Sequence, residues 1–164
     1  MTSLLPKPSR RHFLALSGTA LLLAGCSTTS VLAPTPTPGS RDETAAALAL
    51  VNKLRQSKGL SALSLDAPAR KAAAAQSVRM AKARQMSHLI GLGDSFGGRM
   101  AKSEVSLPAA ENIASGQDSV DAAVQAWIDS PKHLKNMLGA YKGLGVAVAR
   151  SSDGRNYWAM VLSG

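Results

Sequence analysis

The stretch that decides the fold lies near the C-terminus, where residues 143–162 read GLGVAVARSSDGRNYWAMVL. Two apolar runs, 143–149 and 157–162, flank the turn residues Ser152-Asp153-Gly154. Runs of this length on either side of a Ser-Asp-Gly turn predict a β-hairpin. A hairpin alone is only marginally stable in water, so we expect a third strand, for which residues 111–114 are the candidate.

Helical patterns occupy most of the chain between residue 44 and this hairpin. Apolar spacing, caps and breakers predict helices over 44–57, 67–86, 96–102, 120–129 and 131–137. The residues placed to cap or open these helices are Asp66, either Asp118 or Ser119, and Pro131. Helices followed by a small antiparallel sheet predict an α+β fold, in which helices flank the sheet, with one domain over residues 44–164.

The first 43 residues differ in composition from this domain. Residues 1–25 begin with cations and continue in an apolar run too short to span a bilayer, which is typical of an export signal. The run ends in LAGC at Cys26, which resembles the bacterial lipobox. That resemblance implies a lipidated Cys26, carrying acyl chains such as palmitate, as the first residue of the mature chain. Residues 26–43 are rich in Ser, Thr and Pro and would form an extended tether.

Residues 9–14, SRRHFL, resemble a twin-arginine export signal. Ser27 follows the cysteine, where an aspartate would resemble an inner-membrane retention signal. We therefore expect an exported bacterial envelope protein, attached to the membrane through Cys26. In a Gram-negative cell it would lie on the periplasmic side of the outer membrane.

Charge and composition exclude several classes of protein. Removing Lys7, Arg10 and Arg11 with the signal lowers the net charge from +9 to +6. The remaining cations are scattered and only 4% of residues are aromatic, so we expect no nucleic-acid partner. Attraction to anionic phospholipid or lipopolysaccharide is the more natural consequence. A single cysteine excludes an intramolecular disulfide.

Four segments are unusual together: MSH at 86–88, ENIASG at 111–116, AWIDSPKHLKN at 126–136 and LGVA at 144–147. Their order and spacing resemble the CAP superfamily of cysteine-rich secretory, antigen 5 and pathogenesis-related 1 proteins, in its bacterial SCP-like branch. The resemblance covers residues 44–164 and implies an α-β-α sandwich, which agrees with the fold class above.

The resemblance also implies a cleft lined by His88, Glu111 and His133. The second glutamate of the family would fall near Ser130, so the tetrad of this chain is incomplete. We do not assume that the neighbouring Asp129 replaces it. The family resemblance places Asn112, Trp127, Ser130 and Asn136 near the cleft, and we expect structural roles for them, with Trp127 in the core.

Two imidazoles and one carboxylate are typical zinc ligands, and a zinc-bound water would be a hydrolytic nucleophile. The separations of these three residues fit no metal motif, however. Without metal they would form a hydrogen-bonded cluster in which Glu111 raises the pKa of both histidines. In a plainer interpretation His88 caps the helix over 67–86, Glu111 is solvated and His133 lies on a polar helix face. The sequence leaves these arrangements open.

Our first expectation for the function is a binding module for a small lipid or an envelope partner. Apolar residues around His88 would suit such a ligand, or would equally belong to the core: Met86, Leu89, Ile90, Leu92 and Phe96. The alternatives are a zinc-dependent hydrolase of envelope peptide or glycan, and a structural or adhesive module. Enzymatic activity is disfavoured without being excluded, since catalysis needs positioned partners that the sequence does not display.

Overall fold

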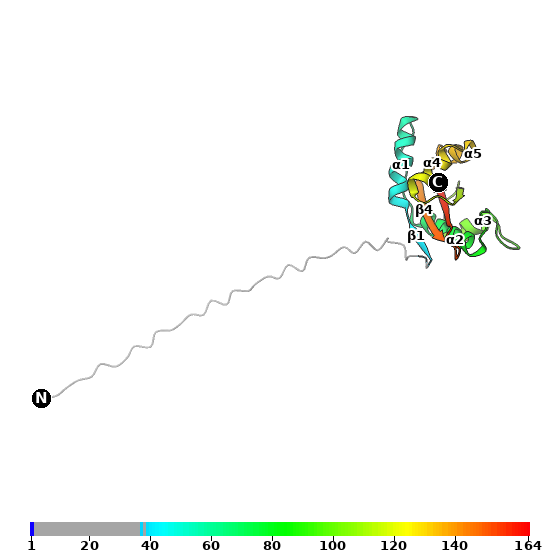
Figure 1. The fold of residues 1–164 in the computed structure, drawn as a ribbon. Helices are drawn as coiled ribbons and strands as arrows, with labels where there is room; N and C mark the ends of the chain where they lie inside the picture. The colour runs from blue at the N-terminus through cyan, green and yellow to red at the C-terminus, as the bar shows by residue number, and fades with distance from the viewer. Residues whose placement is uncertain (2–36, 38) are drawn as a thin grey trace. The chain divides into compact units, whose positions relative to one another are not determined.

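The sheet is centred on the hairpin of β4 (Gly143–Arg150) and β5 (Asn156–Ser163), which pair antiparallel along their whole lengths. β3 (Ala110–Ser115) pairs antiparallel with the other edge of β5, and β1 (Ser40–Asp42) with the other edge of β4. The strand order is therefore β1-β4-β5-β3, with the short β2 (Ser64–Leu65) parallel to the start of β4. Figure 1 shows the domain as a ribbon, with β1 and β4 labelled among the helices. The predicted hairpin and third strand are confirmed.

The structure is a computed structural model that describes Met1, Thr37 and residues 39–164. The expectations for the signal, for Cys26 and for most of the tether lie outside the described residues. Within residues 39–164, no helix is long and apolar enough to cross a membrane.

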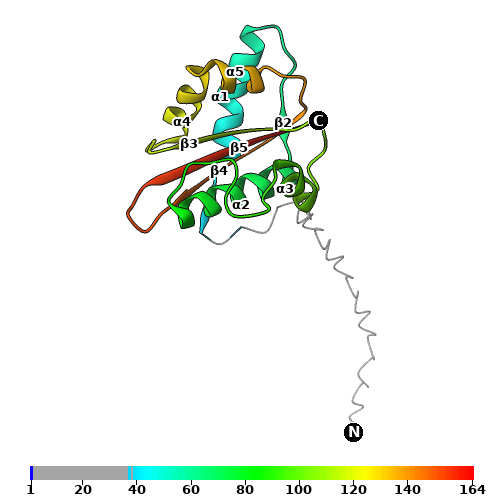
Figure 2. The same ribbon diagram turned by 90° about the vertical axis from the view of Figure 1, so that its right-hand side faces the viewer.

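Helices cover both faces of the sheet (Figure 2). α1 (Thr44–Ser57), α4 (Val120–Ile128) and α5 (Pro131–Met137) lie on one face. α2 (Ala67–Ala83) and α3 (Phe96–Ser103) lie on the other. The predicted α+β class and its α-β-α layering are thus confirmed.

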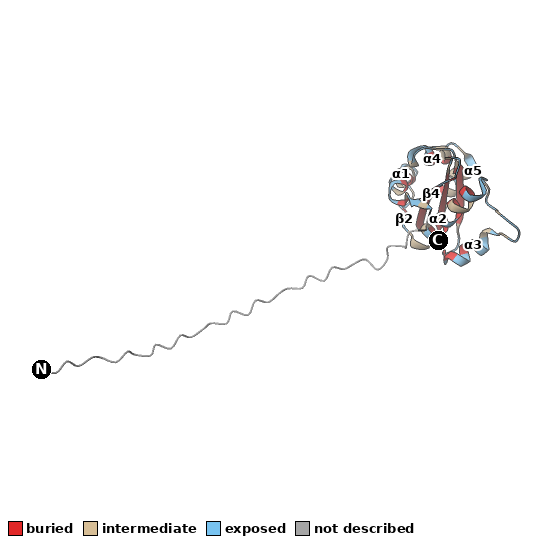
Figure 3. Ribbon diagram, turned by 60° about the horizontal axis from the view of Figure 1, so that its bottom comes forward, coloured by how far each residue is buried: buried red, intermediate tan, exposed pale blue. Residues whose placement is uncertain are grey.

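The two faces of the sheet differ in the size of their side chains. Along β4 and β5, mostly large residues face α1, α4 and α5, whereas the residues on the α2 side include Ala147, Ala149 and Ala159 together with the larger Tyr157 and Val161. The two faces can differ in this way because successive residues of a strand point to opposite faces. At Gly145 a Cβ atom would lie 2.2 Å from the backbone of Ala69 and of Arg70 in α2. In Figure 3 the strands at the centre of the domain are coloured as buried. The core between the sheet and α1, α4 and α5 contains large side chains, among them Trp127, Trp158, Met160, Leu144 and Leu162.

Local signals set the helix ends as the sequence predicts. The Asp66 carboxylate accepts a hydrogen bond from the Ala69 N–H at 3.0 Å, at the start of α2. The Ser119 hydroxyl accepts one from the Ala122 N–H at 3.2 Å, which decides between the two candidate caps of α4. Each cap satisfies an N–H group that a helix start otherwise leaves without a partner.

Two boundaries differ from the prediction. α2 ends at Ala83 because Arg84 takes the left-handed conformation, with φ of 51°. Residues 84–95 therefore form a loop, where a helix to Met86 was expected. The sheet also begins at Ser40, inside the stretch assigned to the tether, and Arg70 of α2 pairs with Asp42 of that strand. A three-residue edge strand has too short a pattern to distinguish it from a tether.

Candidate functional site

Glu111 is the buried centre of the site. It is the second residue of β3, on the face covered by α2 and α3, and its side chain is only 2% exposed. One carboxylate oxygen binds His88 Nδ1 at 2.9 Å and accepts a hydrogen bond from Arg99 Nη2 at 3.0 Å. The other accepts one from Arg99 Nη1 at 2.6 Å. The interpretation of Glu111 as a solvated charge is therefore wrong.

Arg99 belongs to the cluster around Glu111, although the sequence did not lead us to expect it there. Its guanidinium reaches from α3 to both oxygens of Glu111, and it also donates to the His88 carbonyl at 2.9 Å. It lies over the Phe96 ring, with 5.7 Å to the ring centre, and forms an ion pair with Asp94. A bidentate guanidinium orients and neutralises a carboxylate. The sequence feature that could have indicated Arg99 is an arginine on the capped helix that precedes the ENIA segment.

The loop that carries His88 is held by polar side chains from α2. Gln76 donates to the Ser87 carbonyl at 2.8 Å, and Arg79 donates to the Ile90 carbonyl at 2.7 Å. The Asp94 carboxylate closes the loop by accepting from the Ile90 N–H at 2.7 Å. His88 lies five residues beyond the last residue of α2, so the interpretation of His88 as a cap of that helix is wrong.

His133 approaches from the other side of the sheet. It belongs to α5, and its carbonyl accepts a hydrogen bond from the Asn112 side chain at 3.0 Å. Asn136 Nδ2 in turn donates to the side-chain oxygen Oδ1 of Asn112 at 2.8 Å. Both asparagines therefore tie α5 to β3, which is the structural role expected of them.

The His133 imidazole is partly desolvated. Within the described residues, its Nδ1 is buried and has no hydrogen-bond partner. Burial lowers the pKa of His133 below its usual value, and the positive charge of His88 lowers it further. The expectation that Glu111 raises the pKa of both histidines is therefore wrong for His133. Glu111 and Asn112 are consecutive residues of a strand, so they point to opposite faces and only one faces α5.

This shift predicts how stability depends on pH. In the unfolded chain His133 titrates near 6.5 and in the folded chain it titrates lower. The folded state thus binds fewer protons between these values. We expect full stability above pH 6.5, and a decline as the pH falls through 6.5 toward the folded pKa.

Urea unfolding midpoints at about pH 7.5, 6 and 5 measure this dependence, and His133→Gln should flatten it. Asp94 does not contribute to this decline. The hydrogen bond from Arg79 lowers the pKa of Asp94 from 3.8, so the effect of Asp94 on stability falls below that pH. An identical decline in the wild type and in His133→Gln would contradict the assignment to His133.

Two cavities open elsewhere on the domain, and neither is lined by His88, Glu111 or His133. One of about 700 Å³ lies between α1 and α4, with Leu50, Leu54 and Val124 among its lining residues. The other, of about 520 Å³, lies between α2 and α3. The apolar residues around His88 were expected either to contact a ligand or to belong to the core, and they fall into an exposed group and a packed group. Met86, Leu89 and Leu92 are exposed, whereas Ile90 and Phe96 pack against the core under α2.

The sequence model of the cysteine-rich secretory protein family, CAP, matches residues 48–162. The chain belongs to this family. The resemblance seen in the four sequence segments is thereby confirmed, and the match covers residues 48–162.

Two proteins of Bacillus subtilis (strain 168) are similar in sequence. The first is the uncharacterized membrane protein YlbC, which is 33% identical over 112 residues, covering 67% of this chain and 32% of YlbC. The second is the uncharacterized protein YkwD, which is 34% identical over 106 residues, covering 63% of this chain and 41% of YkwD. The chain thus matches between about a third and two fifths of the length of these relatives.

Solved structures of bacterial proteins share the fold. An extracellular protein with an SCP domain from Bacillus anthracis has a TM-score of 0.65 and 27% identity, covering 74% of this chain and 40% of that one. An outer surface protein of Borrelia burgdorferi also has a TM-score of 0.65, with 20% identity, covering 73% of this chain and 90% of that one. The second likeness concerns the fold alone.

The CAP domain does not assemble the zinc site that the sequence left open. Among the described residues, no three His, Cys, Asp or Glu side chains are placed to hold one metal ion. Both oxygens of Glu111 are bound by Arg99, and its hydrogen bond to His88 uses Nδ1 of that ring. A carboxylate paired in this way with a guanidinium does not suit a cation, so the three residues do not fit a shared zinc ion.

Trp127 and Ser130 were also expected near the cleft, with Asp129 beside Ser130. Trp127 is buried and its Nε1–H donates to the Ile113 carbonyl at 3.1 Å, as expected of a core residue. Ser130 precedes the first residue of α5, and its side chain makes no capping hydrogen bond there. The exposed Asp129 accepts from the Gln125 side chain at 2.8 Å. Among the described residues, the Asp129 carboxylate therefore bonds to Gln125 and not to Glu111.

Proposed function

We propose that this CAP domain is a binding module of the bacterial envelope, and that its site at His88 and His133 takes a small amphipathic ligand. The observation that carries the proposal is the pairing of both Glu111 oxygens with Arg99. A buried carboxylate held by a bidentate guanidinium already has its hydrogen-bond partners. Glu111 therefore acts as an anchor that orients His88, rather than as a general base or a metal ligand.

The chemistry around the histidines supports a ligand with one polar end. His88 offers its outer nitrogen, because Nδ1 faces Glu111 and the side chain is 51% exposed. His133 adds a buried Nδ1 that has no partner in the described structure. Two imidazoles would hydrogen-bond a carboxylate or hydroxyl group.

The loop beside His88 supports an apolar body for that ligand. Met86 and Leu89 are 52% and 53% exposed, although both are large apolar residues. The hydrogen bonds from Gln76 and Arg79 hold the loop in place, so these side chains form a preformed apolar surface. A fatty acid or a lysophospholipid combines the two features.

Residence in the envelope is part of the same proposal. Solved relatives are named as an outer surface protein and as an extracellular protein. Export through the twin-arginine route, lipidation of Cys26 and attachment to the periplasmic side of an outer membrane are consistent with those names. The tether before Ser40 would then hold the CAP domain close to the membrane.

The binding proposal is tested on the chain from Ser27 to Gly164, which contains every described helix and strand. Palmitate and a lysophospholipid are titrated below their micellar concentrations by calorimetry. We expect the double variant His88→Ala, His133→Ala to bind about tenfold or more weakly, because each lost hydrogen bond costs about 1 kcal/mol. Gln56→Ala, at an exposed position of α1 that lines neither of the two cavities, serves as the control. Equal affinities of the wild type and the double variant for both probes would reject the histidine site.

A further inference from the structure

A second candidate site lies between α2 and α3, in the cavity of about 520 Å³. Four of its lining residues are cationic, namely Lys71, Arg79, Arg99 and Lys102, and one is acidic, Asp94. The remaining lining residues are mostly small or hydroxylic, which leaves room for a ligand: Thr37, Ala72, Ala75, Gln76, Gly93, Ser95, Gly98 and Ser103.

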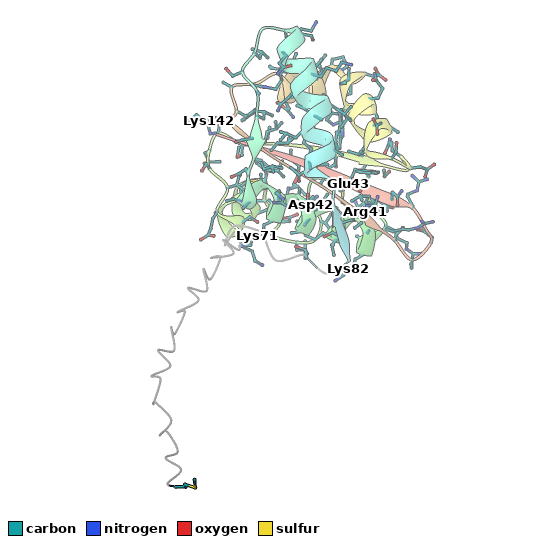
Figure 4. All side chains as sticks on the ribbon, turned by 90° about the vertical axis from the view of Figure 1, so that its left-hand side faces the viewer. Arg41, Asp42, Glu43, Lys71, Lys82 and Lys142 are labelled. Atoms are coloured by element: carbon teal, nitrogen blue, oxygen red, sulfur yellow. The ribbon has the colours of Figure 1, made fainter. Side chains whose placement is uncertain are left out.

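The charges of this cavity do not balance. Arg79 pairs with Asp94, and Arg99 pairs with Glu111 and Asp94. The two arginines are thereby neutralised by the two carboxylates. Within the described residues Lys71 and Lys102 form no ion pair, and both are exposed. Figure 4 shows Lys71 on the surface at α2, with Lys82 further along the same helix. The cavity therefore carries two uncompensated positive charges.

Two features beside the cavity point to a bilayer as the source of its ligand. Leu92 directly precedes the lining residue Gly93 and is fully exposed, although apolar. Thr37, which also lines the cavity, lies eleven residues after Cys26. Eleven residues reach at most about 40 Å, so a chain anchored at Cys26 would keep the cavity near the membrane surface.

We propose that this cavity binds the phosphate of an anionic phospholipid headgroup, and that Leu92 enters the interface of the same bilayer. Lys71 and Lys102 supply the charge, and the Ser95 hydroxyl can donate because its oxygen already accepts from the Gly98 N–H at 3.1 Å. Cations beside an exposed apolar residue are the combination that binds proteins to anionic membrane surfaces. The closeness of the membrane rests on the proposed anchoring at Cys26, whereas the headgroup site itself does not.

The test uses the chain from Ser27, which lacks the anchor, so that failure of lipidation and failure of this site are distinguishable. Binding is measured by co-sedimentation with phosphatidylcholine vesicles that contain about 30% phosphatidylglycerol or none. The site variant is Lys71→Gln, Lys102→Gln. Its matched control is Lys53→Gln, Lys132→Gln, which removes the same charge from exposed positions on α1 and α5, across the sheet.

We expect the wild type to bind only the vesicles with phosphatidylglycerol. The site variant should bind them roughly 30-fold more weakly, and the control should stay within about threefold of the wild type. Leu92→Ser should weaken binding about fivefold, whereas Leu107→Ser, which removes another exposed leucine, should not. The double variant of His88 and His133 should bind vesicles like the wild type, which separates this site from the proposed ligand site.

Equal losses in the two lysine pairs would overturn the proposal, since they would show diffuse attraction without a site. Titration with glycerol 3-phosphate distinguishes the source of the phosphate. Binding of glycerol 3-phosphate that depends on Lys71 and Lys102, without vesicle binding by the wild type, would overturn the bilayer as the source.

Discussion

Arg99→Ala is expected to destabilise the domain by about 3–5 kcal/mol, the largest effect of any single change at the site. The substitution would leave the Glu111 carboxylate, which is 2% exposed, without either of its guanidinium hydrogen bonds. It would also remove a hydrogen bond to the His88 carbonyl and free the loop before α3. Urea unfolding at pH 7.5, monitored by tryptophan fluorescence, measures the free energy of unfolding.

The control for this prediction removes the charge that Arg99→Ala leaves behind. The double variant Arg99→Ala, Glu111→Gln should recover a large part of the lost free energy, because no ionised group remains buried without a partner. Arg99→Lys should fall between the wild type and Arg99→Ala, since an ammonium group cannot bind both oxygens in the same way. A loss below about 1 kcal/mol for Arg99→Ala would show that Glu111 does not depend on the guanidinium.

Gly145→Ala should have the second largest effect, a loss of about 3 kcal/mol. The new Cβ atom would lie 2.2 Å from the carbonyl carbon of Ala69 and 2.2 Å from the nitrogen of Arg70. Both are backbone atoms of α2, so no side chain can rotate away, and the helix itself must move off the sheet. The urea midpoint of the purified variant measures the cost.

The matched control is Gly97→Ala, which adds the same methyl group to α3. No atom lies within 4 Å of the position that this Cβ would take. Replacing a helical glycine by alanine there should stabilise the domain by up to about 1 kcal/mol. Opposite signs for the two substitutions would confirm that contact with α2 decides the effect. A neutral Gly145→Ala would contradict the close packing of α2 on β4.

The sequence predicts most of the fold because its elements are long and clearly marked. The helices over 44–57 and 131–137 have the bounds expected of them, and caps such as Asp66 satisfy their helix ends as expected. The short strands were beyond reach, since Ser40–Asp42 and Ser64–Leu65 hold too few residues for any periodicity. The early end of α2 depends on the left-handed backbone of Arg84. An arginine is not a residue type that predicts this conformation.

The candidate site was predicted in part. Three residues widely separated in the sequence were chosen from the family resemblance, and the structure joins His88 to Glu111 directly. His133 reaches the site from α5, which packs on the opposite face of the sheet, to which Asn112 points, and it lies near enough to His88 for the charge of that residue to lower its pKa. Strand alternation could have predicted that the two histidines approach from opposite faces, since Glu111 and Asn112 are consecutive. Arg99 was not predicted as part of the site, because only tertiary packing brings Glu111 to it.

We infer that Glu111 anchors a binding site and is not part of a metal centre. Calorimetric titration of zinc into the chain from Ser27, near pH 7.5 and without a histidine tag, tests it most directly. The comparison is with His88→Ala, His133→Ala. We expect no tight one-to-one binding that depends on the two histidines. Stoichiometric zinc binding by the wild type that the double variant loses would contradict it.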